Sequence, residues 1–330
     1  MSHNSAGPRR GGGTPAVEVT DLVKRYRTAS RNAVDGISFE VPEGQLFCLL
    51  GPNGAGKTTT VSVLTTTLAP TSGTVRIAGW DVRREQAEVR RRLGVVFQQP
   101  SLDLNLTVEE NIRLHAVLYG MFPWRPTFRL MTPAYRSAVQ EAAGVLGLAD
   151  LLGRPARALS GGLRRRLEIV RALMHAPAVL FLDEPSAGLD PESRRSLWEH
   201  LRQVRSHYGT TVFLTTHYLE EAETADTVCV IYQGRIIEHG SPAEVKGRQL
   251  AAQLVLDARD RGELRRELRA LGIQTGGDGQ PDGAGPLRVH LDGRSAQSVV
   301  AALSTELTTF RISEPTLEEA YLQLLTRAGS

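Results

Sequence analysis

A glycine-rich stretch near residue 50 has the residue types and the spacing of a phosphate-binding loop. It reads GPNGAGKTT and matches the pattern G-x-x-x-x-G-K-[ST] between an apolar run and a helix-like run. Glycines let backbone N–H groups approach a phosphate closely. Lys57 would place a compact charge between the β- and γ-phosphates, and the Thr58 hydroxyl would reach Mg²⁺. The expected nucleotide contacts are Gly51, Pro52, Asn53, Gly54, Ala55, Gly56, Lys57, Thr58 and Thr59.

Two adjacent acids, Asp183 and Glu184, have carboxylate groups, which the phosphate-binding loop lacks. They follow the apolar run VLFL, so a buried strand would carry both to its C-terminal end, next to the connecting loops. An aspartate placed in this way holds Mg²⁺, and the neighbouring glutamate can orient and deprotonate the attacking water. The plain alternative is a pair of solvated acids at the end of a strand.

The stretch ALSGGLRRRLEI at 158–169 has the features of a second anion site. Ser160 is a favourable N-cap residue, and apolar residues recur after it at helical spacing. Three arginines follow within about one turn, where positive charge opposes the helix dipole. Free N–H groups, a hydroxyl and this charge together indicate an anion. The alternative is a capped helix start and nothing more.

The elements that must hold these residues alternate between buried strands and helices. This alternation predicts an α/β fold with a largely parallel sheet. The region from about 107 to 175 is mostly helical in pattern, and 227–240 alternates around Gln233 and Gly234 as a hairpin. The expected strands that lead to site residues are 44–50, 93–99, 178–182 and 210–216.

Length and composition favour a chain of about two domains without a membrane span. The chain has 330 residues, and its formal net charge of +3 is too small to indicate a nucleic-acid partner. No apolar run approaches the roughly 18 residues that a span needs. Cys48 and Cys229 each lie inside an apolar run and are expected to be buried free thiols, which fits a reducing compartment.

The two ends of the chain differ from its middle. Residues 1–16 are rich in Gly, Pro and Ser and are expected to form a disordered tail. Residues 243–330 alternate between strand-like and helix-like runs around a glycine-rich loop at 276–285, and they contain none of the upstream motifs. We therefore expect a main domain at 17–242 and a small C-terminal α/β domain.

The motifs, taken together and in their order, carry a family resemblance. GPNGAGKT, LSGG, LDEP, GLD and a histidine after a buried strand resemble the ATP-binding-cassette (ABC) family over roughly 17–242. The resemblance implies a P-loop NTPase cassette with a RecA-like core, an antiparallel β subdomain and a helical signature subdomain at about 105–175. It implies ATP and Mg²⁺ as cofactors and ATP hydrolysis as the reaction.

The resemblance also implies roles for residues outside the phosphate loop. Tyr26 matches the aromatic residue that stacks on adenine. Gln98 matches the glutamine that touches Mg²⁺ and the water and senses the membrane partner, with Gln99 as the alternative. His217 matches the histidine that contacts the γ-phosphate, and Asp190 lies in the loop that crosses to the opposite subunit. The implied Mg²⁺ ligands are Thr58, Gln98 and Asp183.

The family arrangement explains why one chain would carry two anion sites. In the family two cassettes pack head-to-tail, so that the phosphate loop of one and the LSGG helix of the other close on the same ATP. Ser160, Gly161 and Gly162 would then bind the γ-phosphate held by a second copy of this chain. The usual glutamine after LSGG is Leu163 here, which would weaken a sugar contact.

The C-terminal region extends the resemblance to one group within the family. EPTLEEAYLQLL and the α/β stretch before it resemble the tail of daunorubicin-resistance-type exporter ATPases. That likeness implies an exporter subunit on the cytoplasmic face of the cell membrane, driven by ATP and paired with a separately encoded permease. The alternative is a soluble ABC ATPase that acts on ribosomes or as a chromosome or DNA-repair clamp.

The segment within 120–133, which contains GMFPWRPTFRLMT, is longer than is usual in this group. It contains two phenylalanines, a tryptophan and two prolines, which are unusual in an exposed connection. One hypothesis is a contact with the membrane partner or the membrane surface through Phe122, Trp124 and Phe128. The alternative is packing within the helical subdomain.

Overall fold

The computed structural model describes residues 14–249, 253–273, 275–276, 286–291 and 294–329. They fall into two compact units, Met1–His239 and Gly240–Ser330, which we describe separately. Of the expected N-terminal tail, residues 1–13 lie outside the described part. Ala16 is buried, and its N–H donates to the Val41 carbonyl at 2.8 Å.

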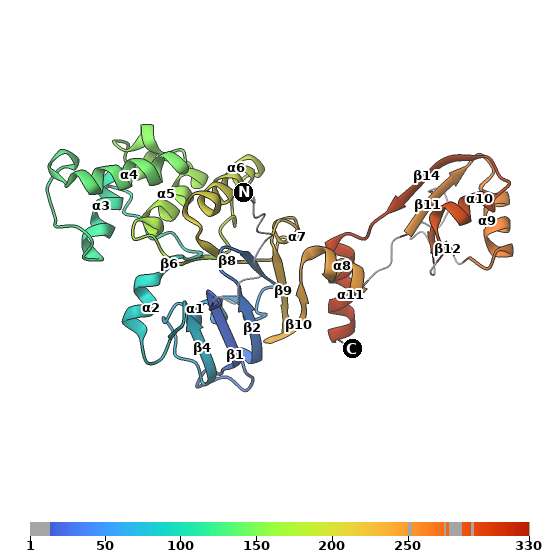
Figure 1. Ribbon diagram of the computed structural model, residues 1–330, viewed down its shortest axis with the longest axis horizontal. Helices are drawn as coiled ribbons and strands as arrows, with labels where there is room; N and C mark the ends of the chain where they lie inside the picture. The colour runs from blue at the N-terminus through green and yellow to red at the C-terminus, as the bar shows by residue number, and fades with distance from the viewer. Residues whose placement is uncertain (1–13, 250–252, 274, 277–285, 292–293, 330) are drawn as a thin grey trace, which may run out of the picture. The chain divides into compact units, whose positions relative to one another are not determined.

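The core of the first unit is a six-stranded sheet in the order β10-β9-β3-β8-β7-β6 (Figure 1). The pairs β9–β3, β3–β8, β8–β7 and β7–β6 are parallel. Strands β3, β7 and β8 are buried along their whole length, as expected for strands covered on both faces. The predicted α/β core is confirmed. The strands are β3 (Leu46–Leu50), β6 (Leu93–Val96), β7 (Val179–Asp183), β8 (Thr211–Thr216), β9 (Thr227–Tyr232) and β10 (Arg235–Gly240).

Two smaller expectations about these strands hold. Strands β9 and β10 are neighbours joined at Gln233 and Gly234, which both have positive φ, as a tight hairpin turn requires. Cys48 of β3 and Cys229 of β9 are free and buried, and burial raises the pKa of both thiols. These cysteines are therefore core residues.

A four-stranded antiparallel sheet forms the predicted β subdomain, in the order β2-β1-β4-β5. Its apolar side chains belong to the same hydrophobic cluster as those of the core sheet. Phe39 of β2 stacks on Phe47 of β3 with 5.2 Å between ring centroids. The strands are β1 (Val17–Lys24), β2 (Val34–Val41), β4 (Ser72–Ile77) and β5 (Trp80–Asp81).

A helical subdomain joins β6 to β7. Its three helices begin at good caps, because Thr107, Thr132 and Ser160 each accept a backbone N–H from the following turn. The longest helix between Lys57 and Ser160 has 13 residues, so this region contains no long coiled coil of the clamp type. The elements are α3 (Val108–Leu118), α4 (Pro133–Val145), α5 (Gly161–Leu173) and 3₁₀ turns at Phe128–Leu130, Ala149–Leu151 and Ala156–Ala158.

The remaining helices of the first unit lie next to strands of its sheets. Helix α1 starts directly after the glycine loop, α6 follows β7, and α7 follows β8. Helix α2 precedes β6, the strand that leads to Gln98. The bounds are α1 (Lys57–Leu64), α2 (Gln86–Arg92), α6 (Pro191–Tyr208) and α7 (Leu219–Ala222).

The second unit combines a helix pair with a small antiparallel sheet in the order β12-β13-β11-β14. Helix α8 contacts α11, and the strands pack with α9 and α10 around their own apolar cluster. The predicted C-terminal α/β fold is confirmed, whereas the glycine-rich loop lies largely outside the described residues. In the described part of the chain, no helix has both the length and the apolar character that a membrane crossing needs. The elements are α8 (Pro242–Gln249), β11 (Gln253–Ala258), α9 (Arg261–Ala270), β12 (Thr275–Gly276), β13 (Leu287–His290), α10 (Ala296–Ala301), β14 (Leu307–Ser313) and α11 (Leu317–Gly329).

Candidate functional site

The glycine loop wraps the start of α1 between β3 and the hairpin of β9 and β10. Gly56 has φ of 112°, and a Cβ there would lie 2.5 Å from the Ala33 carbonyl oxygen. A side chain at this position would meet backbone that cannot move aside, so only glycine fits. The loop therefore ends with bare backbone at the first turn of α1, the arrangement that binds phosphate.

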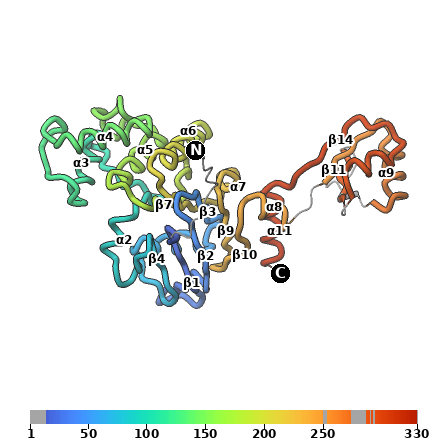
Figure 2. The backbone as a smooth tube through the Cα atoms, viewed as in Figure 1, coloured from blue at the N-terminus to red at the C-terminus, as the bar shows by residue number. Residues whose placement is uncertain are grey.

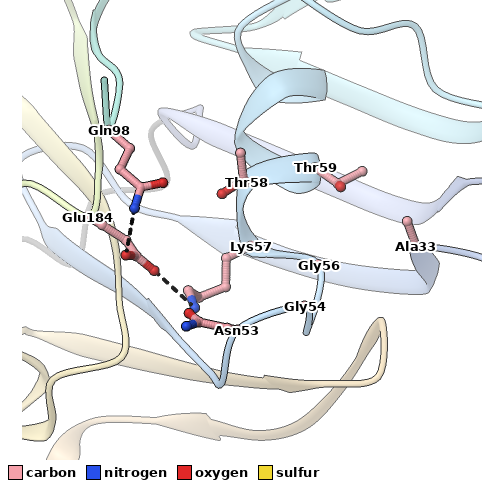
Figure 3. A pocket seen from close by; sticks show the side chains of 9 residues that line it. All are labelled: Ala33, Asn53, Gly54, Gly56, Lys57, Thr58, Thr59, Gln98 and Glu184. Carbon is pink, nitrogen blue, oxygen red and sulfur yellow. Dashed lines mark hydrogen bonds and ion pairs between the residues drawn. The ribbon is translucent and has the colours of Figure 1, made fainter. Parts of the chain in front are cut away.

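A hollow of about 300 Å³ opens at this loop (Figure 3). Gln98 and Glu184 reach it from the ends of β6 and β7, opposite the residues of α1. The structure therefore brings the predicted phosphate loop, glutamine and glutamate to one place. The lining residues are Ala33, Asn53, Gly54, Gly56, Lys57, Thr58, Thr59, Gln98 and Glu184.

Glu184 is the centre of the polar contacts in the hollow. Its Oε1 lies 3.3 Å from Lys57 Nζ and 3.3 Å from His217 Nδ1. Gln98 Nε2 donates to its other carboxylate oxygen at 3.3 Å (Figure 3). Four residues that the sequence assigned to catalysis thus converge, although they come from four separate stretches of the chain.

The backbone of Glu184 is held in an unusual conformation. Its φ of 46° lies in the left-handed region, which costs a non-glycine residue about 1–3 kcal/mol. Its N–H donates to both the carbonyl and the hydroxyl of Thr215, each at 3.1 Å. These bonds to the neighbouring strand β8 hold the turn, so the carboxylate is aimed at the phosphate loop.

Lys57 is buried, and the phosphate loop itself holds its ammonium group. Its Nζ donates to the carbonyl oxygens of Gly51 at 2.7 Å and Pro52 at 3.2 Å, in addition to its ion pair with Glu184. An ammonium group held at three points in this way is fixed beside the hollow.

The residues expected to hold magnesium provide a matching set of oxygen atoms. Thr58 Oγ1 donates to Asp183 Oδ1 at 3.4 Å, and the same carboxylate oxygen accepts the Thr215 hydroxyl. Hydroxyl and carboxylate oxygens suit Mg²⁺, which commonly takes few protein ligands and completes its shell with water and nucleotide phosphates. The donor set therefore fits this ion. Asp183 is buried at the end of β7.

Tyr26 lies outside the lining of the hollow but touches its border. Its hydroxyl is 3.2 Å from Thr59 Oγ1, and Lys24 Nζ lies 5.7 Å from the centroid of its ring. Tyr26 is exposed. The ring is therefore available for stacking at the α1 end of the phosphate loop, as the resemblance implies for adenine.

The LSGG residues and Asp190 form a separate group, and none of them lines the hollow. Ser160 accepts the Leu163 N–H at 3.3 Å, and Asp190 accepts the Ser193 N–H at 2.9 Å. Hydrogen bonds from Ser193 hold the pKa of Asp190 below its usual range. A Cβ on Gly162 would lie 2.8 Å from the Cβ of Ser193, so the starts of α5 and α6 are in close contact.

The arginines after LSGG are satisfied within the chain. Arg164 donates to two carbonyl oxygens at the turn before α5, and Arg166 donates to the carbonyl at the end of α4. Carbonyl groups accept these hydrogen bonds without neutralising the positive charge, so the expected anion near this turn stays a prediction. Periodicity placed the helix, but it could not show which carbonyl groups surround each guanidinium.

Arg165 is a positioning residue that the sequence reasoning missed. It is buried, and it donates to the carbonyl oxygens of Phe97 at 2.6 Å and Glu184 at 3.3 Å. It also donates to Glu168 at 2.9 Å. Phe97 precedes Gln98, so one guanidinium braces the backbone on both sides of the Gln98–Glu184 contact. The sequence indicates this contact only through Arg165 and Glu168, two opposite charges three residues apart in RRRLE.

The sequence of this chain is similar to a known protein family and to several of its members. A family profile described as "ABC transporter" matches residues 34–187. The chain is 39% identical over 319 residues to the daunorubicin/doxorubicin resistance ATP-binding protein DrrA of Streptomyces peucetius, covering 94% of this chain and 92% of the relative. It is 42% identical to the Nod factor export ATP-binding protein I of Ralstonia nicotianae, covering 74% and 73% of the two chains.

A solved structure has the same fold over the first unit. It is the dimeric structure of a post-hydrolysis state of the ATP-binding cassette MJ0796 bound to ADP and Pi. The TM-score is 0.59 with 25% sequence identity, and the match covers 68% of this chain and 98% of that one. The fold around the hollow is thus the fold of a chain that holds a nucleotide.

Proposed function

The chain belongs to the ABC transporter family, and from this premise we propose that it is the ATPase subunit of an exporter whose membrane-spanning part is a separate chain. It is an ATP-binding subunit of the exporter type, and ATP hydrolysis is its reaction. The proposed permease would carry the cargo. Since one relative is named for resistance to daunorubicin and doxorubicin, we propose a drug-like cargo, with a lipid-like cargo as the alternative.

The observation that carries the proposal is the convergence of Lys57, Gln98 and His217 on Glu184 beside the phosphate loop. Lys57 and His217 would move their contacts from this carboxylate to the γ-phosphate of a bound nucleotide. Glu184 would then be free to accept a proton from a water that Gln98 orients. The aromatic ring of Tyr26 would stack on the adenine.

The magnesium ion would be held by Thr58, Asp183 and Gln98. When bound, it would neutralise charge on the β- and γ-phosphate oxygens. The contribution of this chain is to place the Thr58 hydroxyl and the Asp183 carboxylate together at the start of α1, with Thr215 holding Asp183 in place.

A second copy of the chain would complete the site. Ser160, Gly161, Gly162 and Asp190 gather at the touching starts of α5 and α6, apart from the hollow that would hold the nucleotide. Two chains related by a two-fold axis would each present this group to the other's nucleotide. The subunit would work on the cytoplasmic face of the membrane, with both copies under the permease.

The test is the exchange of Glu184 for glutamine in the purified chain. Glu184→Gln keeps the shape but cannot accept the proton, so ATP turnover should fall by about 10²–10⁴-fold while ATP binding persists. Glu199→Gln, a substitution at an exposed acid of α6 beyond its first turn, is the matched control and should keep normal turnover. Unchanged turnover in Glu184→Gln would contradict the proposed base.

A further inference from the structure

The segment between α3 and α4 has an inner and an outer set of aromatic residues. Phe122 and Phe128 meet the Tyr135 ring edge-on, with 5.3 and 6.0 Å between centroids. Tyr135 is fully buried, and its hydroxyl donates to Glu109 at 2.9 Å. The two phenylalanines therefore belong to the packing of the helical subdomain, and for them the membrane hypothesis is wrong.

The outer set faces solvent. Trp124 is 61% exposed and Leu130 is 60% exposed, and Leu118 and Tyr119 are exposed at the end of α3. Figures 1 and 2 show this segment on the outer side of α3 and α4, away from the core strands. Single exposed apolar residues are ordinary, but several large ones from one short segment indicate an interaction surface.

The exposed charged side chains of the segment itself have one sign. Glu109 and Glu110 line a neighbouring hollow with Pro126, Thr127 and Phe128, but each forms an ion pair with Arg113, and Glu109 is buried. No Asp or Glu occurs between residues 111 and 140. Arg129 and Arg136, with Ser137 and Gln140, line a shallow hollow of about 450 Å³ at the start of α4. Among the residues that the structure describes, neither guanidinium has a hydrogen-bond or ion-pair partner, and Arg125 is exposed nearby.

We propose that these residues bind the surface of a membrane that contains anionic lipids. This Trp124 patch is defined as Leu118, Trp124, Arg125, Arg129, Leu130 and Arg136. The tryptophan and leucines enter the interface between headgroups and acyl chains, where amphipathic aromatic rings are favoured. The arginines bind lipid phosphates, which are anions of matching geometry.

The charge pattern favours a bilayer over a protein as the occupant. The surface of a protein partner carries both signs of charge, so a docking site for it gains from acids as well as arginines. A patch with arginines, a tryptophan and no acids instead matches a surface that is negative throughout. Lipid binding by this patch needs neither nucleotide nor permease. A chain that does not bind lipid could therefore still be the proposed ATPase subunit.

The test is binding of the purified full chain to vesicles without nucleotide. We expect sedimentation with vesicles of phosphatidylcholine mixed with phosphatidylglycerol, weak binding to phosphatidylcholine alone, and loss of binding in high salt. Trp124→Ser with Leu130→Ser should weaken binding by about tenfold or more. Arg129→Gln with Arg136→Gln should do the same, because each arginine near an anionic surface contributes several-fold.

The second unit offers a matched control. Phe310 and Ile312 of β14 are 62% and 57% exposed, an aromatic and an aliphatic side chain on either side of an arginine. Phe310→Ser with Ile312→Ser should bind vesicles like the unchanged chain. Arg266→Gln with Arg269→Gln on α9 is the control for charge. ATP turnover without lipid should be normal in all of these variants.

A second measurement locates the contact. The chain has three tryptophans, and Trp80 stacks with Arg92 while Trp198 is buried. Brominated lipid should therefore quench mainly Trp124, and Trp124→Phe should abolish that quenching while it keeps most of the binding. Equal binding to both vesicle types, or equal losses in patch and control variants, would overturn the proposal. Patch variants that bind vesicles normally but no longer bind a protein partner would also overturn the proposal.

Discussion

Lys57 and Glu184 form the central charged pair of the site, and their contacts explain why the lysine is specific. Lys57 Nζ donates to two loop carbonyls while it lies 3.3 Å from Glu184 Oε1. A single nitrogen with three donors can serve all of these acceptors at once and can turn toward a phosphate. A planar guanidinium presents its donors as a fixed fork and is larger, so arginine does not fit the same loop.

Replacement of Lys57 should therefore strongly reduce both ATP binding and ATP turnover, whether or not the new side chain is charged. Lys57→Ala removes the charge that would bind the β- and γ-phosphates, and turnover should fall by about 10²–10³-fold with much weaker ATP binding. Lys57→Arg should not restore either property. Calorimetric ATP titration and steady-state turnover measure the two effects. Lys246→Ala, in the second unit, is the control; near-normal activity of Lys57→Arg would contradict the argument from shape.

At the scale of elements, the contact between the starts of α5 and α6 gives Gly162 a packing role. An alanine Cβ at Gly162 would lie 2.8 Å from both Cβ and Oγ of Ser193. Overpacking of this kind costs about 1–3 kcal/mol, so Gly162→Ala should lower the melting temperature. Adding Ser193→Gly removes the clashing atoms and should recover most of the loss. If the double variant is no more stable than Gly162→Ala, the glycine is not required by this contact.

A second contact between elements should make stability depend on pH. The His115 ring of α3 lies tilted against the Tyr119 ring with 4.3 Å between centroids. Tyr119 in turn stacks on His175, which follows α5, with 5.3 Å between centroids. Burial, with smaller effects of Arg171 and His175, lowers the pKa of His115 to about 4. Because the unfolded chain binds this proton near pH 6.5 and the folded chain does not, stability is present above pH 6.5 and is lost as pH falls toward 4.

The measurement is thermal unfolding between about pH 7 and pH 5, within the range where only the unfolded chain is protonated at this site. His115→Phe keeps an aromatic ring in the stack and removes the proton, so its melting temperature should fall less over this range than that of the unchanged chain. Identical slopes for His115→Phe and the unchanged chain would exclude His115 as the cause.

Motifs with fixed spacing made most of the cassette predictable from the sequence. GPNGAGKT and LDEP each follow a continuous apolar run, so strand, loop and site could be placed together. Side-chain partners were harder to predict. Periodicity shows which face of a helix is buried, but not which carbonyl groups contact Arg165 or which ring contacts Phe122. Composition likewise could not separate the packed Phe122 from the exposed Trp124, since both are aromatic residues of one segment.

At the scale of the whole molecule, the proposal requires two chains. The phosphate loop and the LSGG group have different places in one chain, and the close contact of Gly162 with Ser193 ties LSGG to the loop that holds Asp190. An interface that joins the hollow of one chain to this group of another is self-complementary, so closure produces two equal sites. ATP that contacts both chains would then stabilise the dimer, because it binds more tightly to the dimer than to the separate chains.

Dimerisation should therefore depend on ATP and on Ser160. In Glu184→Gln, bound ATP persists, so the chain should elute as a dimer in size-exclusion chromatography with ATP and as a monomer without it. Adding Ser160→Arg places a bulky side chain against the partner's nucleotide and should restore the monomer, while ATP binding by each chain persists. Arg195→Ser, at an exposed position of α6 one turn beyond Asp190, changes the charge nearby without touching LSGG and is the control. A double variant that dimerises as well as Glu184→Gln alone would mean that LSGG does not close on a partner's ATP.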